Sequence, residues 1–209
     1  MKRISKKSTL ALAVLMLAAI AVTLAAAQNP PGPPKPGPEV AKLKFFLGSW
    51  KITGDIKPGP MGPGGKFTGT GKNEWMPGGF FIEGHEIGNM AAMGKVTSTA
   101  YLGYDQENKV YTYDEFASTG EHTVAKGTVE GDTWTWTSET KEAGKVVKGR
   151  FIEKVTSPTS YDFKFEASID GGEYQTFLEG KATKAGAAAG AKPASGKAAP
   201  GDAGKPKTN

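Results

Sequence analysis

Alternation of apolar and polar side chains is the sequence feature that most constrains the fold. In YDFKFEASID, residues 161–170, every second side chain is apolar and those between are polar or charged. In DTWTWTSE, residues 132–139, Trp134 and Trp136 share one face against threonines. A period of two residues places successive side chains on opposite faces of a β-strand and does not fit a helix. These segments therefore predict strands with one buried face.

Strand-like segments of this kind repeat along most of the chain, with turn residues between them. MPGG (76–79) and DGG (170–172) have the composition of tight turns. Before the first strand, EVAKLKFFL (39–47) carries apolar side chains at helical spacing and is followed by Gly48. The predicted strands are 49–56, 66–75, 80–88, 95–105, 109–117, 121–130, 133–140, 145–155, 160–169 and 173–183.

This order of elements predicts an all-β fold. Successive strands joined by short turns pair with their neighbours, and closing the sheet removes its exposed edges. We therefore expect a single up-and-down antiparallel β-barrel of about ten strands, lipocalin-like, with a short N-terminal helix. An open sandwich of two sheets is the structural alternative.

Several motifs also resemble known families. LKFFLGSW (43–50) is similar to the Gly-x-Trp start of lipocalin and fatty-acid-binding-protein barrels. NEWMPGGFFIEGHEIG (73–88), TAYLGYDQENKVYTYDEFASTG (99–120) and GTVEGDTW (127–134) together resemble the DUF1579 family of bacterial proteins of unknown function. The resemblance covers most of 41–182 and implies the same barrel. It implies no reaction and no ligand.

The two ends of the chain have compositions of their own. A basic start, an apolar run and Ala25–Ala27 predict a signal peptide over 1–27, with an uncleaved anchor as the alternative. Residues 28–38 read as a Pro-rich linker, 39–183 as the barrel domain and 184–209 as a disordered tail without large apolar residues. We expect export to the periplasm or the cell exterior, with no transmembrane span after signal removal.

Charge and cysteine content exclude several function classes. The net charge of +5 comes from the ends, because residues 28–181 carry 17 basic and 20 acidic side chains. The sequence therefore predicts no nucleic-acid partner, although the lysines of the tail would suit anionic envelope surfaces. The chain has no cysteine, which excludes disulfides, thiol catalysis and Cys-based metal sites.

Aromatic side chains on the predicted strands are the candidates for a binding pocket. We expect a small apolar or amphipathic ligand held against them, although each could instead be packed core. The candidate lining residues are Trp50, Trp75, Phe81, His85, Tyr101, Trp134, Trp136, Phe163 and Phe165. Two alternatives are a filled barrel acting as a structural or protein-interaction module, and a barrel enzyme that uses His85 in acid–base chemistry.

The chain offers few candidates for metal, cofactor or catalytic sites. Glu83 and His85 share a face of one predicted strand, but nothing in the sequence brings His122 next to them. The haem-binding nitrobindins share a barrel of this kind and use a histidine near the C-terminal end, and no histidine follows His122 here. No Gly-x-Ser-x-Gly motif is present. We therefore predict no metal ligands, no cofactor and no assigned catalytic residue.

Overall fold

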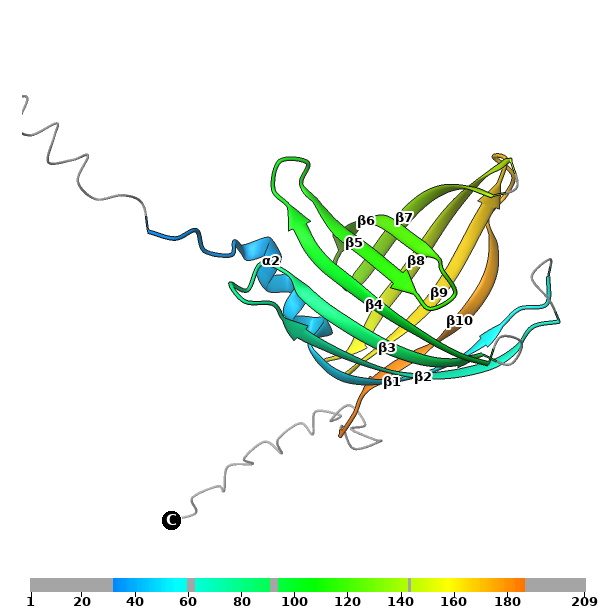
Figure 1. Cartoon of the computed structure of the whole chain (residues 1–209), viewed down its shortest axis with the longest axis horizontal. Coiled ribbons are helices and arrows are strands. Elements are labelled where there is room, and N and C mark those ends of the chain that lie inside the picture. Colours follow the sequence, from blue (N-terminus) through cyan, green and yellow to red (C-terminus); the bar gives the residue numbers. More distant parts are fainter. Residues whose placement is uncertain (1–31, 60–62, 91–93, 143, 187–209) are drawn as a thin grey trace, which may run out of the picture.

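The computed structural model describes residues 32–59, 63–90, 94–142 and 144–186, and within these ranges ten strands form a closed barrel (Figure 1). A short helix, α2 (Pro38–Lys42), continues into a 3-10 turn, η1 (Leu43–Phe46). The strands are β1 (Gly48–Ile56), β2 (Gly65–Trp75), β3 (Ile82–Met90), β4 (Gly94–Asp105), β5 (Val110–Ala117), β6 (His122–Glu130), β7 (Thr133–Glu142), β8 (Lys145–Ser157), β9 (Ser160–Ile169) and β10 (Gln175–Lys184). The all-β class and the number of strands predicted from the alternation are confirmed.

Each strand pairs antiparallel with the next, and β1 pairs with β10 to close the sheet. The closing seam runs in register from Trp50 opposite Lys184 to Ile56 opposite Leu178. This seam leaves no free sheet edge, so the fold is the predicted up-and-down barrel and not the open sandwich. Every strand consequently has one face inside the barrel and one outside.

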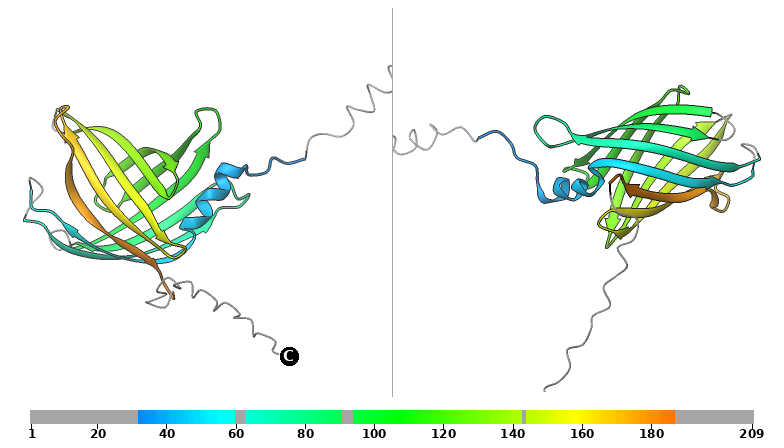
Figure 2. Two further views of the ribbon diagram at one scale, coloured as in Figure 1. Left: turned by 180° about the vertical axis from the view of Figure 1, so that it is seen from behind. Right: turned by 90° about the horizontal axis from the view of Figure 1, so that it is seen from below.

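The N-terminal helix closes one end of the barrel, as both views in Figure 2 show. The indole Nε1 of Trp50 donates a hydrogen bond of 2.7 Å to the carbonyl oxygen of Phe46, and Asn73 Nδ2 donates one of 2.9 Å to the same oxygen. The Phe46 ring packs edge-on against Trp134 at 5.0 Å between centroids. Between η1 and β1 the chain turns at Gly48, whose φ of 99° suits glycine. We call η1 and the rings packed on it the base of the barrel.

The predicted signal peptide, part of the linker and nearly all of the predicted tail lie outside the described residues. The strand β10 ends at Lys184, next to the predicted domain boundary. Within the part of the chain that the structure describes, no helix is long and apolar enough to cross a membrane.

Candidate ligand-binding cavity

A cavity of about 420 Å³ occupies the barrel interior. It extends from Phe46 at the base to Glu121 and Glu142, which are exposed at the opposite end of the barrel. The cavity therefore reaches the surface at the end away from α2. One wall comes from β1, β2, β8, β9 and β10 and is apolar. Its side chains are those of Ile52, Phe67, Phe151, Phe163, Phe165 and Leu178.

Glycines on neighbouring strands make room for the rings that project inward. A Cβ atom added to Gly127 would lie 2.5 Å from the ring of Trp136, and one added to Gly180 would lie 2.6 Å from the ring of Phe163. Real Cβ atoms do not approach a ring so closely. Only glycine at these positions lets the rings lie against the backbone of the next strand. The aromatic side chains thus line the wall and leave the centre of the barrel open.

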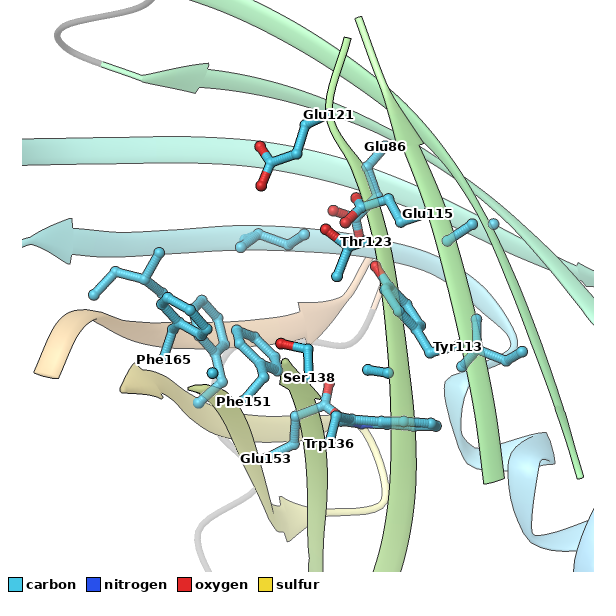
Figure 3. Close-up of a pocket in the computed structure, with 18 of the residues that line it drawn as sticks. Glu86, Tyr113, Glu115, Glu121, Thr123, Trp136, Ser138, Phe151, Glu153 and Phe165 are labelled. Carbon is cyan, nitrogen blue, oxygen red and sulfur yellow. The ribbon is translucent and has the colours of Figure 1, made fainter. Parts of the chain in front are cut away.

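Carboxyl groups also line the cavity, and one of them, Glu153, stands on β8 beside the apolar wall. Five of the lining residues are glutamates, and none of the lining residues is Lys, Arg or His. Figure 3 shows Glu86, Glu115 and Glu121 on one side of the cavity and Phe151 and Phe165 on the other. The lining glutamates are Glu86, Glu115, Glu121, Glu142 and Glu153.

Glu86 projects inward from the middle of β3. It stands in register with Gly71 of β2, and a Cβ atom added there would lie 3.4 Å from Glu86 Oε1. The residue is exposed, and it lines the cavity with the surface that it exposes. Desolvation inside the barrel raises the pKa of Glu86 from 4.5 to about 7, with the charge of Glu115 adding to the effect.

Glu153 is the deepest of the five carboxyl groups, with only 7% of the residue exposed. On β8 it stands between Trp134 of β7 and Phe163 of β9. Its Oε2 accepts a hydrogen bond of 2.8 Å from Trp136 Nε1, and its Oε1 has no donor among the described residues. Burial raises the pKa of Glu153 to about 7 although the Trp136 bond opposes the shift, and the charge of Glu86 raises it further.

Tyr113 contributes a neutral hydroxyl to the same space. Burial raises the pKa of Tyr113 well above its ordinary value, and the carboxyl groups of Glu115, Glu86 and Glu153 add to this shift. The phenol is therefore protonated at any physiological pH. It can donate one hydrogen bond and accept others beside the acidic groups.

The structure distributes the nine candidate residues over three locations. Trp136, Phe163 and Phe165 line the cavity. Trp50 and Trp134 are buried at the base, where they pack on η1, and Trp75 packs against the same cluster of side chains. These three tryptophans therefore close the barrel and do not line the cavity.

The other three candidates lie on the outer wall. Phe81 is 48% exposed and covers Gly103, where an added Cβ atom would lie 2.5 Å from its ring. The Nδ1 atom of His85 lies 3.1 Å from Thr99 Oγ1, and Tyr101 donates a hydrogen bond of 3.2 Å to Glu83. None of the three lines the cavity, because the inward positions of both β3 and β4 are the even-numbered ones.

The second histidine also lies on the outer wall. His122 stacks on Phe116 at 4.4 Å between ring centroids, and its Nε2 lies 3.3 Å from Asp114 Oδ1. Within the described ranges, no group of three or more His, Cys, Asp or Glu side chains is placed to hold a metal ion.

The reading of the sequence missed the inward glutamates. A signal for Glu86 was present: it shares its parity on β3 with Ile82, which is fully buried, and with Gly84 and Gly88. Small inward residues on both sides of a carboxylate indicate space inside the barrel. Phe81 occupies an odd-numbered position. Because it is large and apolar, the odd-numbered positions were predicted to be the buried ones.

One solved structure supports the fold. The crystal structure of Rv2717c from M. tuberculosis aligns with a TM-score of 0.50 and 16% sequence identity, covering 72% of this chain and 99% of that chain. The structure of EF1p2_mFAP2b bound to DFHBI aligns with a TM-score of 0.39 and 11% identity, covering 70% of this chain and 98% of that chain. No curated protein matches the sequence.

One family model matches the barrel from end to end. Its description is "Protein of unknown function (DUF1579)", and it covers residues 35–184, which include α2 and all ten strands. The matched part is well over half of the chain. The chain therefore belongs to the DUF1579 family.

Proposed function

We propose that this barrel binds a small amphipathic molecule inside its cavity. The observation that carries the proposal is the open interior of about 420 Å³, which lies within the range of small-molecule pockets. The apolar wall would bury an apolar body, and the carboxyl groups and the phenol that share the cavity would orient a polar head.

The alternative of a filled structural barrel is less well supported. In a barrel filled by its own side chains, a carboxyl group at the centre would be buried without partners, which costs folding free energy. Such a barrel is therefore expected to have an apolar interior. Here Glu86 and Glu153 project into the interior. The Oε1 atom of Glu153 receives no hydrogen bond from the described residues. The enzyme alternative loses its proposed residue, because His85 faces away from the cavity.

Native mass spectrometry of the protein purified from an exporting host tests the proposal. We expect a discrete mass above that of the polypeptide, and we expect solvent extraction to remove it. A bare polypeptide mass, with no uptake from a panel of amphipathic molecules, would contradict ligand binding.

A cavity-filling variant sharpens this test. Ala100 lines the cavity from β4, with Gly84 and Glu115 beside it on the adjacent strands. Ala100→Phe would occupy part of the space and should lower ligand retention. Thr97→Phe places the same ring on the exposed outer face of β4 and serves as the control. Circular dichroism checks that both variants are folded.

We also propose that the protein acts outside the cytoplasm, and that the tail contacts anionic envelope polymers. The support is the signal-like composition of residues 1–27 and the dispersed lysines of residues 184–209. Cell fractionation with N-terminal sequencing tests export. A mature chain that starts near Gln28 is expected, whereas an intact Met1 in the cytoplasmic fraction would contradict the proposal.

A further inference from the structure

We infer that the preferred ligand is an organic cation, an apolar body that carries a protonated amine. This inference rests on the proposed function and specifies the class of molecule that the cavity takes. The sign and position of the charged groups inside the barrel carry it. Charged side chains inside the barrel have fewer partners of opposite charge than those on the outer wall.

Several ionised side chains of the outer wall form ion pairs, whereas none of the glutamates that line the cavity does so with a described residue. Outside, Glu166 is hydrogen-bonded by both Arg150 and Lys164, and Lys66 pairs with Asp55. Inside, none of the five lining glutamates forms a salt bridge with a described residue, and no basic side chain lines the cavity. An acidic enclosure without a resident counter-charge attracts a cation and repels an anion.

Glu153 adds an observation independent of the acidic cluster. Its carboxyl group is more than nine-tenths buried, lines the cavity and receives one hydrogen bond, from Trp136. A carboxylate accepts several hydrogen bonds, so the free Oε1 has the capacity to accept from a bound donor. An ammonium group supplies three such donors and no acceptor. The alcohol or carboxylate of a lipid matches this arrangement less well.

The aromatic wall favours a ligand whose remaining part is apolar. Phe151 and Phe165 face Glu86, Glu115 and Glu121 across the cavity, and Glu153 stands beside Phe163 on the aromatic side. The rings can therefore contact the apolar body of a molecule whose head lies among the carboxyl groups. Aromatic faces also attract cations, which adds to the preference where the head approaches Trp136. A fatty acid would need the reverse arrangement, with a basic side chain at its head.

Protons compete with the cation for these groups. Glu86 is faced by Tyr113 and Glu115 of β5, by Glu121 before β6 and, across the cavity, by Glu153 of β8. Both Glu86 and Glu153 have a pKa near 7, so they are largely neutral at pH 6 and largely ionised at pH 8. An alkyl amine stays protonated over this range. Its affinity should therefore rise with pH.

Three probes of one shape and different head charge test the inference. Naphthylethylamine, naphthylethanol and naphthylacetate carry a cationic, a neutral and an anionic head on the same ring. Isothermal titration at pH 8 should show the amine binding about ten-fold more tightly than the alcohol, and the acetate more weakly than the alcohol. At pH 6 the difference between amine and alcohol should shrink.

Two variants on β3 distinguish a loss of charge inside the cavity from a general effect on folding. Glu86→Gln keeps the shape of the side chain and removes its charge, so it should lower the amine affinity toward that of the alcohol and leave the alcohol affinity within about two-fold. Glu83→Gln makes the same change on the outer face of β3 and should leave all affinities unchanged. Retained alcohol binding shows that each variant is folded.

The outcomes divide clearly. Equal or tighter binding of the alcohol or the acetate would overturn the cation inference and leave the proposed function intact. An equal loss of amine and alcohol affinity in Glu86→Gln would overturn the role of this carboxylate. No binding of any probe would overturn the inference together with the proposed function.

Discussion

At the scale of single residues, the hydrogen-bonded pair of Trp136 and Glu153 contributes both to the wall of the cavity and to its polarity. The indole ring lies flat on Gly127 and forms part of the cavity wall, while its Nε1 satisfies one oxygen of the buried carboxyl group. Without that donor the carboxyl group would lack its one partner among the described side chains. The stability of the barrel and the polarity of the cavity therefore depend on the same pair.

The pH dependence of stability is the prediction that belongs to this scale. Because the pKa of Glu153 is raised from 4.5 to about 7, the folded protein holds this proton where the unfolded chain has lost it. The resulting stabilisation is complete below about pH 4.5 and is lost as the pH rises through 7. We expect the free energy of unfolding to fall by roughly 2–3 kcal/mol between pH 5 and pH 8 through Glu153, with Glu86 acting in the same direction.

Urea unfolding at several pH values measures this slope. Glu153→Gln should flatten it, since the variant has no proton to lose. The carboxyl groups with lowered pKa, such as Glu39, Asp105 and Glu166, change stability only below about pH 4.5 and do not interfere. An unfolding free energy that rises from pH 5 to pH 8, or an equal slope in the variant, would contradict the assignment.

At the scale of elements, the short helix works as a plug for the barrel. The five residues of α2 are too few to be stable alone, so their conformation depends on packing. Tyr111 of β5 donates a hydrogen bond of 2.7 Å to Glu39 Oε2, and Leu43 and Phe46 are buried against the strands. The plug and the barrel therefore stabilise each other.

Phe46→Ala tests the plug. Removing a buried ring that contacts Trp134 and Tyr161 should lower the free energy of unfolding by about 3–5 kcal/mol. It should also enlarge the cavity at the base, because Phe46 is one of its lining residues. Urea denaturation measures the cost, and Phe45→Ala, which removes a less buried neighbouring ring, should cost less. A loss below that of Phe45→Ala would show that the base does not depend on Phe46.

At the scale of the whole molecule, the seam between β1 and β10 decides whether the sheet is a barrel. It joins residues more than a hundred positions apart, from Trp50 and Lys184 to Ile56 and Leu178. Without β10, both β1 and β9 would present unpaired edges.

Two truncated chains test the importance of the seam. A chain that ends after Gly186 keeps all of β10 and should melt at the same temperature as the full chain. A chain that ends after Tyr174 lacks β10, and we expect it to aggregate or remain unfolded. Size-exclusion chromatography with a circular dichroism melt compares them. A folded monomer from the shorter chain would show that closure is dispensable.

The fold could be predicted from the sequence because alternation and turn residues act locally. Runs such as 161–170 give both the strand and its buried face, and the observed strand ends differ from the predicted ones by a few residues at most. The cavity could be predicted only in part, because period two gives two faces without saying which one is inside. Where large apolar side chains occupy the outer wall, as with Phe81 and Phe116, that choice is ambiguous.

In the part of the chain that the structure describes, a plugged base and an exposed rim give a guest molecule the same route in and out. Association and dissociation then both pass the open end, where Glu142 is exposed, while the affinity is set deeper, between the carboxyl groups and the rings. A bulkier side chain at the rim would slow both rates by a similar factor and leave the equilibrium constant unchanged. How long a guest stays and which guest is preferred are thus separate properties of this architecture, and each can change without the other.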